Sequence, residues 1–304
     1  MKKNILPTNQ STLNKINRHY KEATKVEKVL QQEYAHLFRS ALRDFKKVVK
    51  DYNGDFDAIN RHILFNPTDN VKTQIISRID NRTMSILKKE EDAIESLLMK
   101  LFIDNYSMTF FEIQNNIGYE LEYFTLSEDR VRDITNAAWT RDKKGFVSRL
   151  ERNNKLLADD LSEVISEGVA KGRDSIQMAH RLNRTTGAGF YNSQRIIRTE
   201  TARVIAESDA KLYKDLDFEE YRYNATFDSR TSKACGDLDN STFRLEEIQI
   251  GVNAPPMHPN CRSTIDAVNM IDYQPPYKYG KDGVGKPIKI PRGLTYEDWK
   301  KKYL

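Results

Sequence analysis

The chain has 304 residues, of which 38% are hydrophobic and 31% are charged, with 13 glycines and 9 prolines. The apolar fraction is low for one compact sphere of this length and predicts long amphipathic helices with much solvated surface, and so few glycines and prolines exclude a collagen-like or linker-like chain. The net charge of +5 is uneven, because residues 1–52 carry +7, residues 274–304 carry +5, and the segment between them therefore carries −7.

Two basic ends that flank an acidic body suit contact with nucleic acid or another acidic surface; the alternative is solvated helix faces and a flexible tail. The 2 cysteines are too few for a disulfide framework, which indicates assembly in a reducing compartment. No segment approaches the roughly 20 apolar residues of a transmembrane helix, and the N-terminus lacks the apolar core of a secretory signal. We therefore expect a soluble protein that is not exported.

Long helices are predicted in the N-terminal part of the chain. Apolar residues recur every three or four positions across 11–52 and again across 69–102, as on the buried stripe of a helix. Asn53-Gly54 predicts the end of the first helix. The two helices are of similar length, so they form an antiparallel hairpin, or else the first is a protruding arm. A further helical stretch is expected from 106 to Gly118.

Shorter helices are expected in the middle of the chain. Ser127 can cap a helix that contains Trp139, and two more helices are predicted at 156–182 and 192–215. The glycine-containing loop 184–190 between them has neither the P-loop spacing nor the dinucleotide-binding spacing. We interpret it as a turn and expect no nucleotide site there.

The sequence changes character after Asp217. Alternation and aromatic residues predict a strand at 220–227, and a short second segment follows at 242–245, in a small β-containing module at about 218–268. From Tyr273 the chain is rich in proline, glycine and lysine, which is typical of an extended segment. It closes with an amphipathic stretch at 295–304 that is expected to be a docking helix.

The expected fold class is mainly α with a small α+β module. It consists of a long N-terminal helical hairpin or arm, a C-terminal module with a short β-sheet, and an extended basic tail. The domains predicted from these elements are a long-helix region at 1–125, a helical connector at 126–155, the module at 156–271 and the tail at 272–304.

Four short motifs between residues 198 and 263 are the most informative feature of the sequence. They are Arg198-Thr-Glu, Asp228-Ser-Arg-Thr, Cys235 followed by Leu238-Asp239, and Pro255-Pro-Met-His-Pro-Asn-Cys-Arg. In this order and spacing they resemble the head-morphogenesis module of phage minor head proteins, the Mu F-like family. The matching positions, expected to be structural, are Arg198, Thr199, Glu200, Asp228, Arg230, Thr231, Cys235, Asp239, Pro256, His258, Cys261 and Arg262.

The resemblance implies a structural virion component of a tailed phage, located in the capsid interior or near the portal vertex and present in host cytoplasm during assembly. Such proteins take part in head assembly, genome packaging or genome delivery. The partners implied are the portal protein, other head proteins and double-stranded DNA.

The cysteines of the Mu F-like family look like a zinc site, which needs four ligands in a tetrahedron. Here Cys235, His258 and Cys261 match, whereas Ser232 and Ser263 stand where the family has cysteines. Three ligands remain, and a carboxylate could supply the fourth. The carboxylates in question are those of Asp228, Asp237 and Asp239.

Two alternatives to zinc stay open for this loop. Hydrogen bonds and packing can hold it without a cofactor, with Asp228 and Arg230 tying the turn. A disulfide between Cys235 and Cys261 is the other, although assembly in cytosol disfavours it. We expect no cofactor.

We expect no enzymatic activity, because His258 lies between two prolines in a stretch built for rigidity. The alternative is a metal-dependent, nuclease-like enzyme or a Cys–His nucleophile pair built on Cys235, His258 and Cys261. Arg198 and Glu200 are two positions apart and cannot point the same way on a helix, so we expect them to tether their helix to the β-module.

DNA binding is expected at the two basic ends, and aromatic residues are interleaved with lysines at the C-terminus. No helix-turn-helix, zinc-finger or RNA-recognition signature accompanies these residues, so the binding predicted is sequence-independent. A portal-binding adaptor without DNA contact is the alternative. The candidate DNA-binding residues are Lys21, Lys25, Lys28, Arg39, Arg43, Lys46, Lys47, Lys50, Lys278, Lys281, Lys300, Lys301 and Lys302.

Overall fold

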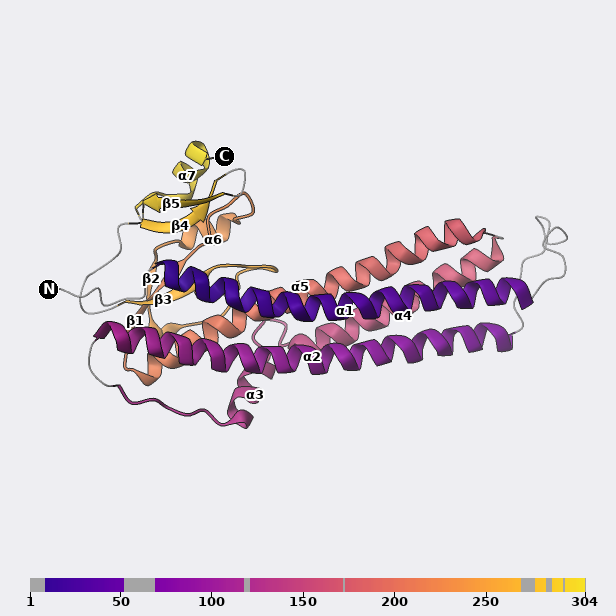
Figure 1. Ribbon diagram of the computed structural model, residues 1–304, viewed down its shortest axis with the longest axis horizontal. Helices are drawn as coiled ribbons and strands as arrows, with labels where there is room; N and C mark the ends of the chain where they lie inside the picture. The colour runs from indigo at the N-terminus through magenta and orange to yellow at the C-terminus, as the bar shows by residue number, and fades with distance from the viewer. Residues whose placement is uncertain are drawn as a thin grey trace. The chain divides into compact units, whose positions relative to one another are not determined.

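The computed structural model describes residues 9–51, 69–117, 121–171, 173–268, 277–282, 286–291 and 293–303 (Figure 1). These residues form seven α-helices, one short 3-10 helix, a three-stranded sheet and a two-stranded sheet. The predicted fold class, mainly α with a small β-containing module near the C-terminus, is confirmed. None of the helices in this described part is long and apolar enough to cross a membrane.

The chain divides into two compact units that are discontinuous in sequence. We call them the helical unit, formed within 25–94 and 146–196, and the module unit, formed within 1–24, 95–145 and 197–304. The four continuous domains predicted at 1–125, 126–155, 156–271 and 272–304 do not coincide with these units. The reason is that the three longest helices each contribute residues to both units.

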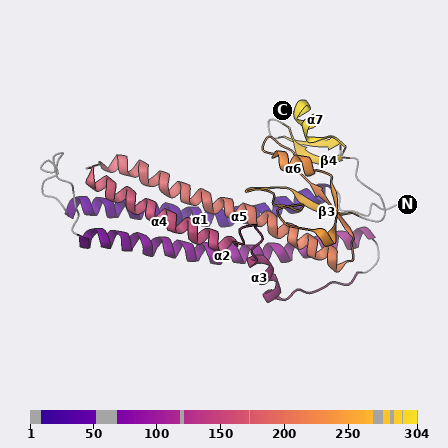
Figure 2. The same ribbon diagram turned by 180° about the vertical axis from the view of Figure 1, so that it is seen from behind.

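The helical unit is built from parts of four helices, α1 (Asn9–Asp51), α2 (Asp69–Ile117), α4 (Phe146–Ala170) and α5 (Ser175–Asp215). Within it α1 and α2 run antiparallel, as both views show (Figure 1 and Figure 2), so the predicted hairpin is present. Glu33 pairs with Lys89, and Asp44 pairs with Arg82. The core contains Tyr34, Leu37, Ala41, Phe45, Ile75, Ile79, Ile86, Leu157, Leu161, Ile165, Met178 and Leu182.

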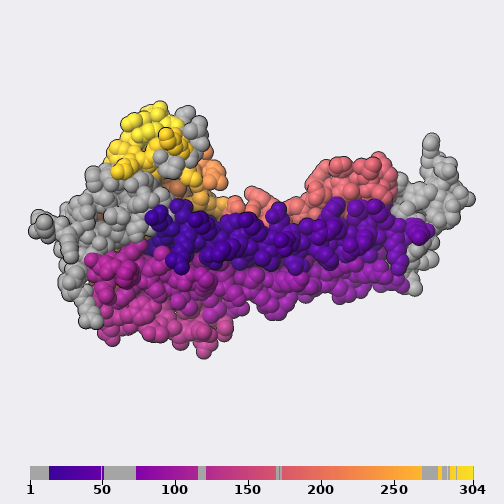
Figure 3. Space-filling model, in the orientation of Figure 1, coloured from indigo at the N-terminus to yellow at the C-terminus, as the bar shows by residue number. Residues whose placement is uncertain are grey.

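The helices in the first half of the chain differ in their boundaries from those predicted. The second helix and the stretch from 106 are one element, α2, which runs through to Ile117. The predicted helix ends at Asn53-Gly54 and Gly118 lie outside the described residues. The surface of α1, coloured indigo, is open to solvent on the face shown in Figure 3.

The predicted turn at 184–190 is wrong, because α5 continues through it. A Cβ at Gly189 would lie 2.9 Å from the ring of Tyr34 and 3.1 Å from the side chain of Leu157, so this glycine permits close helix packing rather than a turn. The break lies earlier, after α4. There the Asp174 carboxylate accepts hydrogen bonds from the first backbone N–H groups of α5, at Ile176 and Gln177, both at 2.8 Å.

The module unit contains α3 (Glu128–Asn136), which is capped by Ser127 as predicted. Trp139 lies beyond the end of this helix and not within it. The indole Nε1 of Trp139 donates to the carboxylate of Glu200 on α5 at 3.0 Å. The buried guanidinium of Arg203, also on α5, donates to the carbonyl of Ile134 at 3.1 Å and pairs with Glu200. These contacts hold the end of α3 against α5.

The three-stranded sheet has the order β2-β1-β3 and is antiparallel throughout. Its strands are β1 (Glu220–Asn224), β2 (Thr242–Arg244) and β3 (Thr264–Val268), with α6 (Lys233–Leu238) and the 3-10 helix η1 (Leu245–Glu247) between them. Both views place the sheet beside the C-terminal part of α5 (Figure 1 and Figure 2). Tyr213 of α5, Tyr221 of β1 and Ile265 of β3 belong to the buried cluster that joins them.

The predicted extended tail is wrong for the residues described there. They form a β-hairpin of β4 (Tyr277–Lys281) and β5 (Pro287–Pro291), followed by α7 (Tyr296–Tyr303). The expected C-terminal helix is present, but it docks on its own module, because Trp299 is fully buried beside Phe227 and Tyr296. The favourable free energy of burying this indole holds the segment in the folded module, although the residues before it are rich in proline and glycine.

Candidate functional site

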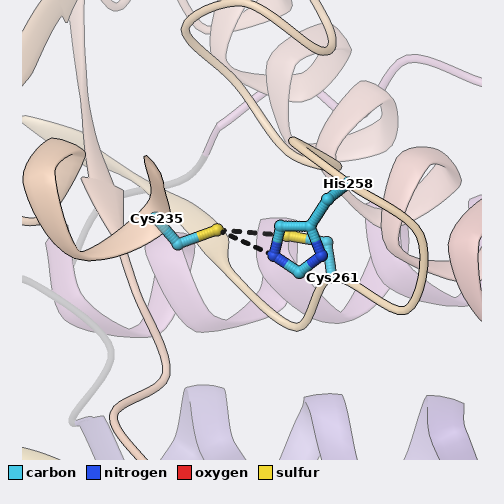
Figure 4. Close-up of side chains that lie close together, drawn as sticks. All are labelled: Cys235, His258 and Cys261. Carbon is cyan, nitrogen blue, oxygen red and sulfur yellow. Dashed lines mark hydrogen bonds between the residues drawn. The ribbon is translucent and has the colours of Figure 1, made fainter. Parts of the chain in front are cut away.

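The candidate site is formed by two cysteines and a histidine that the motif spacing brings together (Figure 4). Cys235 lies on α6, whose start is capped by Ser232, since the Ser232 hydroxyl accepts from the Cys235 backbone N–H at 3.2 Å. His258 and Cys261 lie on the loop before β3. Among the residues that the structure describes, these three form the group of histidine, cysteine and acidic side chains that could hold a metal ion.

The three side chains lie within hydrogen-bonding distance of one another. The Sγ atom of Cys235 is 3.3 Å from Nε2 of His258 and 3.7 Å from Sγ of Cys261, and the candidate ligand atoms all lie within 4.8 Å of one another. The Nδ1 atom of His258 is 2.9 Å from the carbonyl oxygen of Pro259, which can only accept. Nδ1 therefore carries a proton, and Nε2 is the atom directed at the sulfur.

Polar contacts around Cys235 favour its thiolate. The pKa of Cys235 is lowered by the hydrogen bond with the Cys261 thiol, and then, against the opposing effect of burial, by hydrogen bonds with His258 and with the hydroxyls of Ser232 and Ser263. Tyr223 on β1 donates its hydroxyl to the same sulfur at 3.3 Å.

The pKa values of the two partners of Cys235 shift in the opposite direction. The pKa of Cys261 is raised by its hydrogen bond to Cys235 and by burial. The pKa of His258 is also raised, mainly by the hydrogen bond with Cys235, against the opposing effect of burial and with a smaller contribution from the hydrogen bond with the Pro259 carbonyl. These directions place the negative charge of the cysteine pair on Cys235 rather than on Cys261.

Hydrogen bonds tie the cysteine loop to two long helices. The Tyr20 hydroxyl of α1 donates to the Cys261 carbonyl at 3.0 Å, and the Asn260 backbone N–H donates to the Thr199 hydroxyl of α5 at 3.0 Å. Thr199 thus connects the Arg-Thr-Glu motif to the module. Its neighbour Glu200, predicted to do so, binds Trp139 and Arg203 instead.

The turn after β1 has the predicted Asp228–Arg230 contact and one contact that was not predicted. The Arg230 backbone N–H donates to Asp228 Oδ1 at 2.8 Å, and Thr231 closes the turn with its N–H on the Asp228 carbonyl at 3.0 Å. The guanidinium of Arg262 donates to both carboxylate oxygens of Asp228. The cysteine loop is thereby joined to this turn.

The three predicted carboxylates have other partners than the cysteine cluster. Asp228 binds Arg262, Asp237 pairs with Lys233 at 2.6 Å, and Asp239 accepts from the Ala225 backbone N–H at 2.9 Å. Two thiols and one imidazole fit three corners of a tetrahedral zinc site, and the Nδ1–carbonyl hydrogen bond gives the imidazole the tautomer such a site needs. The described histidine, cysteine and acidic side chains supply no fourth ligand here.

Two residues of the site were missed by sequence reasoning. Tyr223 shares a face of β1 with Tyr221, and the strand alternation could have indicated that both are buried. Tyr20 gives no such signal, because its contact with Cys261 joins positions 241 residues apart.

The predicted DNA-binding residues that the structure describes lie mainly at the surface. All the candidates on α1 are exposed, and so are Lys281, Lys301 and Lys302. Lys300 is less exposed and lies 3.4 Å from the Glu297 carboxylate and 5.3 Å from the centre of the Tyr296 ring. The side chain of Lys278 lies outside the described part.

Residues 159–266 match the family described as "Phage Mu protein F like protein". The matched segment contains the four motifs between Arg198 and Arg262, which confirms the resemblance and supports a phage head-related protein and a place in the virion.

The chain is also 22% identical over 247 residues to the "NAD(+)--arginine ADP-ribosyltransferase EFV" of Enterococcus faecalis (strain ATCC 700802 / V583). That alignment covers 77% of this chain and 49% of the relative, so the chain spans about half the length of the curated relative it matches. No solved structure matches the chain.

Proposed function

We propose that this Mu F-like, phage head-related protein is a structural minor head protein of a tailed phage that binds double-stranded DNA without sequence preference. It would lie in the capsid interior or at the portal, and be present in host cytoplasm during assembly. It would act in head assembly, DNA packaging or DNA delivery. Its partners would be DNA, the portal protein and other head proteins. The observation that carries the proposal is a row of exposed cations on α1.

This row, which we call the α1 cation row, consists of Arg39, Arg43, Lys46, Lys47 and Lys50, all exposed. Steps of three and four residues place them on one face of the helix, over about 17 Å at 1.5 Å per residue. Within the described residues, no acidic side chain pairs with Lys46, Lys47 or Lys50. These charges are free to neutralise phosphates and release counterions, which is the main source of sequence-independent affinity.

The test is a titration of two duplexes of unrelated sequence at several salt concentrations. We expect equal affinity for the two duplexes and a falling log K against log salt. Replacing all five residues of the α1 cation row by glutamine should flatten that slope by about 4.5, since each phosphate contact contributes about 0.9. If log K for the parent protein did not change with log salt, DNA binding through phosphate contacts would be contradicted.

A matched control removes the same number of charges elsewhere. Its five lysine-to-glutamine changes fall on exposed residues already paired with carboxylates, so the net charge equals that of the first variant. The control should retain most of the slope. Equal losses in both variants would show that net charge, and not the α1 cation row, drives binding. The control residues are Lys88, Lys89, Lys100, Lys171 and Lys233.

We also propose that the chain has no enzymatic activity of its own, and the ADP-ribosyltransferase named above describes the relative alone. Cys235 and Cys261 are buried, and the His258 ring is tied to the Pro259 carbonyl, which supports a structural role for the cluster. The purified chain should neither release nicotinamide from NAD+ with an arginine acceptor nor cleave a linear duplex with Mg2+ or Zn2+. Either activity, if lost in His258→Ala with the fold intact, would establish an enzyme built on this cluster.

A portal-binding adaptor without DNA contact predicts a different result. Binding to isolated portal protein would then be lost on Lys301→Gln with Lys302→Gln, two exposed positions on α7, while duplex titrations would show no binding by the parent chain. Point changes are needed here, because deleting the C-terminal segment would remove Trp299 from the core.

A further inference from the structure

We infer that Cys235 and Cys261 are a redox-responsive pair, thiols in a reducing environment and an intramolecular disulfide once the protein meets a peroxide. The two sulfurs are 3.7 Å apart. The sequence contains 2 cysteines in all, so each is the other's only partner within the chain. Both are free cysteines in the structure.

The surroundings give the two sulfurs unequal roles. Cys235 accepts a hydrogen bond from the hydroxyl of Tyr223 at 3.3 Å and lies 3.3 Å from Nε2 of His258, and a hydroxyl donor stabilises a thiolate. Cys261 is the more deeply enclosed of the two, at 0% exposure. Cys235 is therefore the sulfur that attacks, and Cys261 is the one that resolves the intermediate.

His258 lies between the surface and the Cys235 sulfur. It is half-buried, and its hydrogen bond to Pro259 lies at the surface. Its other nitrogen reaches the attacking sulfur. One side chain thus connects the surface with Cys235, which is itself buried, so oxidation requires hydrogen peroxide to enter beside this ring.

The reaction balances with peroxide as the only co-reactant. The Cys235 thiolate attacks one peroxide oxygen, the O–O bond breaks, and the hydroxide that leaves takes up a proton, equivalent to the one that the Cys235 thiol lost on ionising, to become water. Cys235 is now a sulfenic acid. The Cys261 sulfur then attacks the Cys235 sulfur, an S–S bond forms as the S–O bond breaks, and the departing hydroxide takes the Cys261 proton. Two thiols are oxidised by two electrons, and one peroxide is reduced to two waters.

The location of the pair gives the disulfide a consequence for the module unit. Cys235 lies on α6, whereas the loop of Cys261 is tied to α1 through Tyr20 and to α5 through Thr199. A bond between the two sulfurs covalently joins elements that now rest on hydrogen bonds and packing, and so raises the midpoint of thermal unfolding. This role rests on the proposed function, because a head protein is assembled in reducing cytosol and carried in a particle outside it.

The test uses the full chain, reduced, freed of reductant and held with a chelator. One equivalent of hydrogen peroxide should lower the intact mass by about 2 Da and remove both thiols that maleimide labels once the chain has been unfolded in denaturant. A dithiol should restore both. In Cys261→Ser, a sulfenic-acid probe should label Cys235, whereas Cys261 in Cys235→Ser should be labelled at least about tenfold more slowly, because Cys261 is fully enclosed.

Three results would overturn the inference. They are two thiols that stay reactive, gains in mass from over-oxidation without the loss of about 2 Da, and disulfide-linked dimers in place of the intramolecular bond. The measurement on the parent chain stands alone if a cysteine variant fails to fold. It also involves no DNA, so failed oxidation leaves the duplex titrations intact, and failed DNA binding leaves the thiol result intact.

Discussion

Both terminal nitrogens of the Arg262 guanidinium donate hydrogen bonds to the carboxylate of Asp228, 34 residues earlier in the chain. The pair closes the cysteine loop onto the turn after β1. Burial alone would raise the pKa of Asp228, but hydrogen bonds from Arg262 and from the Arg230 backbone N–H outweigh it and lower that pKa. The carboxylate is therefore held in its charged form.

Removing the Asp228 charge should destabilise the module unit. Asp228→Asn leaves the Arg262 charge without its partner in a largely enclosed site, at a cost of about 3 kcal/mol in the free energy of unfolding. Urea unfolding followed by tryptophan fluorescence measures it, since Trp139 and Trp299 both belong to this unit. The effect should vanish with acid, because a depressed Asp pKa contributes stability above about pH 4 that is lost as the pH falls through the folded-state pKa.

The neighbouring Arg230 offers a matched control. Its guanidinium is 3.8 Å from the same carboxylate but 69% exposed, and exposed pairs contribute about 0.5 kcal/mol or less. Arg230→Gln should therefore be almost silent. If it cost as much as Asp228→Asn, the bidentate contact with Arg262 would not be the main stabilising interaction of the turn.

Two glycines of α5, two positions apart, should respond oppositely to alanine. A Cβ at Gly189 would press on Tyr34 and Leu157, whereas a Cβ at Gly187 would meet nothing within 4 Å. Gly189→Ala should destabilise the helical unit by about 1–3 kcal/mol through overpacking. Gly187→Ala should stabilise it by about 0.5–1 kcal/mol through helix propensity. Circular dichroism of urea unfolding distinguishes the two, and equal effects would contradict the close packing at Gly189.

These glycines show where prediction from sequence ends. The stripes of α1 and α2 are local and periodic, so their helices and their pairing were predictable. Glycines at 187 and 189 indicate a turn when only neighbours are considered. The packing of Gly189 against Tyr34, which lies far away in sequence, decides otherwise. The C-terminal segment is a similar case, since its composition is that of a linker but Trp299 anchors it in the core.

The candidate site, too, was predictable from the sequence only in part. Cys235, His258 and Cys261 were predicted as a group, because the resemblance to the Mu F-like family matches all three to its cysteine and histidine positions. The contacts that surround them depend on the tertiary fold. Neither the hydroxyl of Tyr20 on the Cys261 carbonyl nor that of Tyr223 on the Cys235 sulfur follows from spacing along the chain.

Glu90 should make the helical unit less stable at alkaline pH. Burial raises the pKa of Glu90 to about 7, against the opposing effect of hydrogen bonds from Ser193 and Tyr34. The folded state thus favours the protonated carboxyl, and stability falls as the pH rises from about 4.5 through 7, by about 3 kcal/mol. Urea unfolding followed by circular dichroism at pH 5 and pH 8 measures the difference.

Glu90→Gln keeps the shape and removes the charge, so it should abolish this dependence and be the more stable form at pH 8. Glu33→Gln serves as the control, because Glu33 forms a surface ion pair with Lys89, whose side chain is 52% exposed. A parent protein equally stable at both pH values would contradict a neutral Glu90.

Zinc retention should depend on the two serines that hydrogen bond to the Cys235 sulfur. Three ligands leave one corner of a tetrahedron open, so the parent chain, purified without added metal and dialysed against a chelator, should hold well under one zinc per chain. Ser232→Cys with Ser263→Cys places thiols where hydroxyls already contact that sulfur. This variant should retain about one zinc and unfold at a higher temperature with it.

The control for this experiment adds two thiols away from the site, by Ser229→Cys with Ser241→Cys, and should retain no more zinc than the parent. Metal content by elemental analysis is the readout. Stoichiometric zinc in the parent chain that disappears in Cys235→Ser would show that a solvent molecule completes the site, and that three ligands suffice. Zinc in neither the parent nor the four-cysteine variant would show that the sulfurs cannot reach tetrahedral positions, which leaves hydrogen bonds and packing to hold the loop.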